Sequence, residues 1–155
     1  MKLLLKDDNG KFRVIADSAV ARSGQPWFLP DFGLNWRWRG AVALRVSRLG
    51  KGIAEKYVSR YYDAATKLWV AEADDCSAED FMDGRVVCGR WIPVEELNGS
   101  YDRVARLIAE ASEFATLKNG DIVAEYDGGP ALPIEPGTTA ALSLEGVETV
   151  NFNIK

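Results

Sequence analysis

The sequence predicts a single α+β domain that is mostly β. Short apolar runs bounded by Gly, Pro and Asn-Gly turns recur along its 155 residues, as in proteins built from many short strands. Only two segments have apolar residues at helical spacing, and they do not alternate regularly with strands. That order argues against a doubly wound parallel sheet. No repeat or long linker divides the chain, so we expect one domain over residues 1–155.

Hairpin signals lie near both ends of the chain. Asn9-Gly10 separates the first two apolar runs, and Glu145-Gly146 separates the last two. These residue types suit the positive φ angles of tight hairpin turns. The predicted strand pairs are Leu3–Lys6 with Phe12–Ala16, and Thr138–Leu144 with Val147–Ile154. In the second hairpin we expect Val150, Phe152 and Ile154 on the buried face, because alternate residues of a strand share one side.

The strongest strand signal lies in residues 35–46. Alternating Trp and Arg residues open this stretch, an apolar run follows, and a glycine-bounded basic turn ends it. Beyond the turn the apolar residues recur every four positions, which predicts a helix from about Gly52 to Asp63. On an alternating strand one face would carry Arg37, Arg39, Ala41 and Arg45.

The remaining elements are short strands and one clear helix. The other predicted strands are Trp27–Leu29, Leu68–Ala73, Val86–Cys88 and Asp121–Glu125. Ser100 is the expected N-cap of the helix, and Asn119-Gly120 should end it. Its predicted apolar face consists of Val104, Leu107, Ile108, Ala111 and Phe114.

Composition excludes several kinds of chemistry. The chain has no histidine, which excludes His-based catalysis and His-ligated metal sites. A net charge of −4 argues against a nucleic-acid partner or an anionic membrane surface. No apolar run is long enough to span a membrane, so a cytoplasmic location is expected. Cys76 and Cys88 are expected to be reduced thiols with no assigned role, and residues 74–83 to form a solvated acidic loop.

Several segments, in order along the chain, together match a pattern known from one protein family. They are Ala16–Ala19 with Gly24–Phe32, Arg48–Tyr57 with Arg60–Asp63, Phe114–Val123, and Phe152–Lys155. Together they resemble the fumarylacetoacetate hydrolase family in its small bacterial form. The resemblance implies a mixed β-sandwich roll with two main helices, which is often dimeric. The chain is shorter than is usual in that family, with the gap between Leu97 and Tyr101.

The same resemblance concerns a metal site. Active family members hydrolyse or decarboxylate acylpyruvate-like acids with Mg²⁺ or Mn²⁺, held by a Glu-x-Glu pair and a later Asp. The matching positions are Arg39 and Ala41 for the pair, and Val70 for the aspartate. The family's lysine falls near Asp80. The resemblance therefore implies that the metal ligands are lost and that no cofactor is expected, with Mg²⁺ or Mn²⁺ implied only under a different match.

Three hypotheses about function follow. The first is a family relative without metal-dependent catalysis that acts as a binding or partner subunit, either as a homodimer or with an active paralogue. The second is a hydrolase, isomerase or decarboxylase of a small keto or diketo acid with a rebuilt site. There Arg37, Arg39 and Arg48 would bind the carboxylic acid, and Asp75 or Glu72 would act as the base. The third is a purely structural protein.

Overall fold

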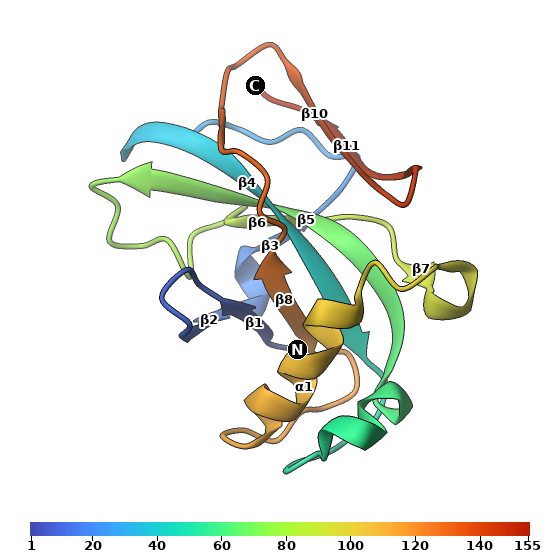
Figure 1. Ribbon diagram of the computed structural model, residues 1–155. Helices are drawn as coiled ribbons and strands as arrows, with labels where there is room; N and C mark the ends of the chain where they lie inside the picture. The colour runs from blue at the N-terminus through green and yellow to red at the C-terminus, as the bar shows by residue number, and fades with distance from the viewer.

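The computed structural model describes residues 1–155 as a curled mixed sheet with a small hairpin packed on it (Figure 1). Seven strands of the main sheet lie in the order β2-β1-β8-β4-β5-β6-β3, while β7 pairs with β5 and β9 with β4. These strands are β1 Leu3–Lys6, β2 Phe12–Ile15, β3 Val20–Arg22, β4 Leu34–Val46, β5 Tyr62–Asp74, β6 Val86–Cys88, β7 Ile92–Pro93, β8 Ile122–Tyr126 and β9 Leu132–Pro133. β10 Thr139–Leu144 and β11 Val147–Asn153 form the separate hairpin. The predicted mostly-β α+β class is confirmed.

Both predicted hairpins form. β1 and β2 pair in antiparallel register around the turn at Asn9-Gly10, and β10 pairs with β11 around Glu145-Gly146. Glu145 and Gly146 both have positive φ angles, as such a turn requires. Val150, Phe152 and Ile154 are buried on one side of the second hairpin, as predicted.

Two antiparallel strands of 13 residues each, β4 and β5, form the centre of the sheet. In their register Arg39 lies opposite Val70, and Ala41 lies opposite Leu68. β8 pairs with the other edge of β4, and β1 runs parallel to β8. Because β4 is bonded on both edges, its side chains occupy fixed positions along the curl.

The helical segments are shorter than predicted. α1 spans Asp102–Ser112, and three 3₁₀ helices accompany it: η1 Asp17–Ala19, η2 Glu55–Arg60 and η3 Val94–Glu96. The helix expected over 52–63 is therefore the short η2, because residues from Tyr62 onward join β5 instead. α1 ends before Phe114, which is 78% exposed, and its N-cap is Tyr101 rather than Ser100.

One predicted strand is reduced to a short pairing with the end of the chain, through three backbone hydrogen bonds. Trp27–Leu29 was expected to be extended and paired, but only Trp27 forms an isolated bridge, to Ile154. The peptide NH of Leu29 does bond the carbonyl of Lys155. The proline after Leu29 has no NH to continue the pairing, which agrees with so short a contact.

Buried side chains form three clusters on the two faces of the sheet. The inner cluster draws on β1, β4, β5, β6 and β8 and includes no residue of α1 or the β10–β11 hairpin, so it fills the inside of the curl. On the outer face, α1 packs its Leu107 and Ile108 against β4 and β8. The hairpin packs Val150 and Phe152 against Trp38 and its neighbours. None of the helices is of the length and apolar character that crossing a bilayer requires.

Candidate functional site

The inward face of β4 is apolar in the middle and cationic at both ends. Ala41 and Ala43 belong to the inner cluster and are fully buried. Arg37 and Arg39 precede them on the same face, and Arg45 follows them, because alternate residues of a strand point to one side. The curl therefore has two ends, each bearing arginine side chains from one strand.

The three positions expected to hold a metal meet on this inward face. Arg39 is the direct cross-strand neighbour of Val70, and Ala41 lies two residues further along β4. Ala41 and Val70 are both 0% exposed. Mg²⁺ and Mn²⁺ need several oxygen ligands, whereas these three side chains supply none. If the expected Glu-x-Glu pair were matched two residues earlier on β4, it would fall on Arg37 and Arg39, which are both cations.

No other group replaces those ligands. The structure contains no cluster of three or more His, Cys, Asp or Glu side chains arranged to hold a metal ion. The residues present therefore do not fit the Mg²⁺ or Mn²⁺ that active members of the resembled family hold at these positions. What occupies this end of the curl is a network of ion pairs.

Arg39 is the centre of that network. Its Nη1 and Nη2 donate to the two carboxylate oxygens of Asp8 at 2.7 and 3.0 Å. Its Nη1 also lies 3.5 Å from Glu72 Oε1, and the guanidinium carbon stands 3.7 Å from the ring centroid of Tyr126. The hydrogen bond to Asp8 raises the pKa of Arg39 and lowers the pKa of Asp8. Arg39 is thus neutralised within the protein.

Glu72 lies between the arginines of this end. Its Oε1 accepts a hydrogen bond of 2.7 Å from the Tyr126 hydroxyl, and its Oε2 is 3.7 Å from Arg37 Nε. Burial, followed by the hydrogen bond to Glu72, raises the pKa of Tyr126, so the phenol stays protonated as the donor. Arg37 also approaches Asp74, at 3.3 Å. Glu72 therefore acts as the shared counter-ion of both arginines.

The predicted site residues do not all come together. Arg37, Arg39 and Glu72 share one polar cavity of about 260 Å³. Arg48 lies beyond the far end of β4, is exposed and forms no ion pair. Asp75 is exposed at a positive φ of 52°, has no side-chain partner and does not line that cavity.

A buried arginine near this end was missing from the sequence prediction. The Arg85 side chain is 0% exposed, and none of its three nitrogens has a hydrogen-bond partner. Its Nη2 lies 3.4 Å from Glu79, and its Nε lies 3.8 Å from Asp80. Asp80 in turn accepts two hydrogen bonds from Arg13. Part of the acidic segment expected to be a solvated loop is therefore a counter-charge for Arg85.

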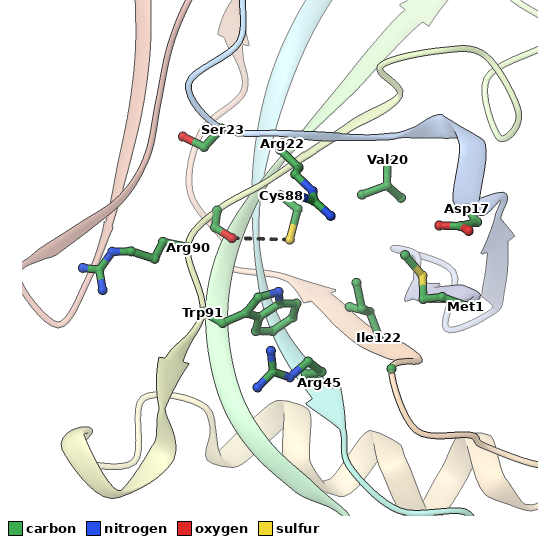
Figure 2. A pocket seen from close by; sticks show the side chains of 12 residues that line it. Met1, Asp17, Val20, Arg22, Ser23, Arg45, Cys88, Arg90, Trp91 and Ile122 are labelled. Atoms are coloured by element: carbon green, nitrogen blue, oxygen red, sulfur yellow. Dashed lines mark hydrogen bonds between the residues drawn. The ribbon is translucent and has the colours of Figure 1, made fainter.

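The opposite end of the curl contains a larger cavity, of about 620 Å³. Figure 2 shows Arg22, Arg45, Cys88 and Trp91 around it. Only Arg45 was a sequence candidate, as part of an arginine wall with Arg37, Arg39 and Arg48, whereas Arg22, Cys88 and Trp91 come from separate segments and carry no motif. Cys88, like Cys76, is a free thiol, as expected.

No family model and no curated protein matches the sequence. Solved structures do match the fold, over 99% of this chain in each of the following cases. A chain assigned to the fumarylacetoacetate hydrolase family from Yersinia pestis CO92 is 19% identical, with a TM-score of 0.87 over 92% of its own length. Maleylpyruvate hydrolase from Sphingobium sp. SYK-6, in complex with manganese(II) and pyruvate, is 17% identical, with a TM-score of 0.85 over 69%.

A third similar structure is fumarylpyruvate hydrolase from Pseudomonas aeruginosa, in complex with Mn²⁺ and pyruvate. It is 12% identical to this chain, with a TM-score of 0.83 over 99% of this chain and 89% of its own. The three matches confirm the expected fold, a mixed β roll as in the fumarylacetoacetate hydrolase family. At such low identity they establish the fold alone.

Proposed function

From this shared fold we infer that the chain is a diverged relative of the fumarylacetoacetate hydrolase family that lacks metal-dependent catalysis and acts as a binding or partner subunit. The observation that carries the proposal is the composition of the expected metal site. Arg39 stands opposite Val70, and Ala41 and Val70 are sealed in the apolar inner cluster. A divalent cation there would face a guanidinium and two hydrocarbon side chains, which offer it no ligand.

The ion pairs around Arg39 support a structural role for the residues at the expected metal site. Asp8, Glu72 and Tyr126 satisfy Arg39 from three sides, so an incoming carboxylate would have to displace one of them. The Asp8 side chain is 67% exposed, so its pair with Arg39 contributes about 0.2–1 kcal/mol, and the half-buried Glu72 and Tyr126 add to the cost of displacement. These internal ion pairs occupy the groups that would otherwise bind a substrate acid, which favours a non-catalytic role.

The competing hypothesis is an enzyme with a rebuilt, metal-free site. The similar hydrolases were solved with manganese and pyruvate, so a small keto acid is the ligand class to test. Arg37 and Arg39 would then bind the acid, with Glu72 as the base. Asp75 and Arg48 would have to act from positions outside the cavity that holds the other three.

Ligand-dependent thermal stability separates these hypotheses, because a ligand of the native state raises the unfolding temperature. The protein is heated with pyruvate, maleylpyruvate or fumarylpyruvate, each with and without Mn²⁺, and hydrolysis is followed in parallel. We expect no metal-dependent shift and no hydrolysis. A shift without metal that Arg39→Gln abolishes would favour the rebuilt site, whereas Mn²⁺-dependent stabilisation with turnover would refute the proposal.

We also propose that the working form is a dimer, either of two copies of this chain or of this chain with an active paralogue. The segment that leads into β4 supports this, because it exposes Phe28, Phe32 and Leu34 by 70%, 48% and 56%. Large apolar side chains gathered on one short segment are typical of surfaces that meet a partner. This segment lies at the same end of β4 as Arg37.

A further inference from the structure

The larger cavity lies at the end of the curl that the metal-site resemblance does not involve. It is lined by β3, the last residues of β4, the end of β6 and the start of β8. Along the inward face of β4, the fully buried Ala41 and Ala43 separate Arg45 from Arg39. The two ends are therefore separate sites, divided by the packed inner cluster.

This cavity has an excess of positive charge. Its lining includes three arginines, Arg22, Arg45 and Arg90, and a single acid, Asp17. Arg22 and Arg90 form no ion pair and no side-chain hydrogen bond. Figure 2 shows Arg22 turned toward the space between Cys88 and Val20, whereas Arg90 extends away from it. Arg22 is therefore the unpaired cation that faces the cavity.

Arg45 is only partly neutralised. Its Nε and Nη2 donate to the two oxygens of Asp63 at 3.1 and 3.2 Å, which leaves Nη1 without a partner. Its guanidinium carbon lies 5.5 Å from the ring centroid of Trp91, so the indole helps to hold the cation at the cavity wall. Arg39 has two carboxylate partners, Asp8 and Glu72, whereas Arg45 has only Asp63.

The wall has one further free donor, on Trp91, because the Cys88 thiol already donates to the Gly89 carbonyl at 3.6 Å. The half-buried Trp91 has an indole NH that makes no hydrogen bond within the protein. The Cys88 thiol is largely buried, and burial raises its pKa to about 12 despite Arg22 and Arg45 nearby. It therefore stays protonated near neutral pH and brings no negative charge to the cavity.

The wall across from these donors is mainly apolar, with the Asp17 carboxylate at its edge. Val20 and Ile122 lie there, as Figure 2 shows, and both belong to or pack against the inner cluster. A ligand that satisfies both walls needs an acceptor-rich anionic group and a hydrocarbon body. Arginine and an indole NH are suited to the two oxygens of a carboxylate.

We propose that this cavity binds a small organic acid, with its carboxylate at Arg22 and the indole NH of Trp91 and its apolar body against Val20 and Ile122. The site is independent of the proposed function, because it shares no lining residue with the cavity around Arg39. Its volume of about 620 Å³ exceeds that of the cavity at the other end.

The test uses the complete chain and two probes, benzoate and inorganic phosphate, measured by titration calorimetry. We expect benzoate to bind with a dissociation constant in the millimolar range or below. Phosphate should bind more weakly, because it lacks the hydrocarbon body. Arg22→Gln and Trp91→Leu should each weaken benzoate binding, Arg22→Gln by about tenfold, which corresponds to one charge-assisted hydrogen bond.

Two control variants fix the location. Arg60→Gln removes an exposed arginine of η2, and Arg39→Gln changes the other end of the curl, so neither should alter benzoate affinity. The absence of saturable benzoate binding, or binding unchanged in Arg22→Gln, would overturn the proposal. Benzoate binding lost in Arg39→Gln would place the acid at the other end and would equally overturn it. Phosphate binding as tight as that of benzoate would refute the role of the apolar wall.

Discussion

At the scale of single residues, Arg85 is a cation held where water does not reach. Its guanidinium is 0% exposed, and its nearest charge is Glu79 at 3.4 Å, outside good hydrogen-bond geometry. Desolvating a guanidinium is expensive, and only the nearby carboxylates offset that cost. The stability of this region therefore depends on keeping those acids charged and in place.

We predict that Glu79→Gln lowers the free energy of unfolding by about 3 kcal/mol, because it removes the nearest counter-charge of a buried guanidinium and leaves only Asp80, at 3.8 Å. Adding Arg85→Met to that variant should recover most of the loss, since the orphaned charge is then gone. Urea denaturation of the two single variants and the double variant gives the coupling energy. Glu113→Gln, an exposed change, is the control. Additive losses in the double variant would show that the two charges do not interact.

Asp121 is a second buried charge, and its hydrogen bonds outweigh the cost of burying its carboxylate. Burial alone would raise its pKa, but hydrogen bonds from the Lys2 ammonium and from the peptide NH groups of Lys118 and Lys2 together lower it. Because the folded-state pKa lies below the unfolded value of 3.8, the carboxylate stabilises the fold above that pH. This contribution is lost as the pH falls through the folded-state pKa.

The pH dependence of one variant tests this balance. Asp121→Asn should lower the free energy of unfolding by about 2 kcal/mol near neutral pH, where charge-assisted hydrogen bonds are lost. The difference from the unmodified protein should shrink as the pH drops below 3.8 and the native carboxylate protonates. Guanidinium denaturation over a pH series measures both. A destabilisation that is equal at all pH values would mean that the charge is irrelevant.

At the scale of elements, Gly89 sets how closely the C-terminal hairpin packs on the main sheet. A Cβ atom there would stand 2.7 Å from Thr66 Oγ1 and 2.7 Å from Val150 Cγ2. Thr66 is fixed by its hydrogen bond of 2.7 Å to the Arg90 carbonyl, so it cannot retreat easily. The contact between β5, β6 and β11 therefore needs a residue without a side chain.

We predict that Gly89→Ala destabilises the protein by about 1–3 kcal/mol through overpacking. Thermal unfolding should show a lower midpoint, and hydrogen exchange should be fastest in β10 and β11, which would be pushed off the sheet. Ser143→Ala, an exposed change on β10, is the matched control. A midpoint equal to that of the unmodified protein would contradict this view of the packing.

The elements differ in how far the sequence foretells them. β4 and the two hairpins follow from alternation and from Asn9-Gly10 and Glu145-Gly146, which are local signals. The η2 segment shows helical spacing, yet the chain leaves the helix at Tyr62 because pairing with β4 is available. The end of the helical segment is therefore set by pairing with a distant strand, which the local sequence pattern does not reveal.

The site residues show the same division. Arg37, Arg39 and Glu72 were candidates from the sequence, and cross-strand pairing brings them together because Arg37 lies opposite Glu72. Arg85 and Arg22 were not foreseen. Arg22 is the last residue of β3 and Arg85 directly precedes β6, and only the curl of the sheet decides that Arg85 is buried and Arg22 faces a cavity.

At the scale of the whole molecule, the apolar segment before β4 predicts self-association. We expect sedimentation to give twice the chain mass of 17.1 kDa at micromolar concentration. Phe28→Ser with Leu34→Ser should shift the protein to monomer without loss of secondary structure, because both side chains are exposed. Val14→Ser, which changes an apolar residue 59% exposed on β2, should leave the mass unchanged. A monomeric unmodified protein would exclude the homodimer.

The two arginine-bearing ends of the curl also respond to salt in opposite directions. Dissolved ions screen charges over about 10 Å at 0.1 M ionic strength. At the Arg39 end this weakens attractive pairs, whereas at the Arg22 end it relieves repulsion between neighbouring cations. The two ends should therefore contribute to the salt dependence of the free energy of unfolding with opposite signs. A bound anion would neutralise the Arg22 end, so the difference in salt response with and without benzoate reports occupancy of the cavity.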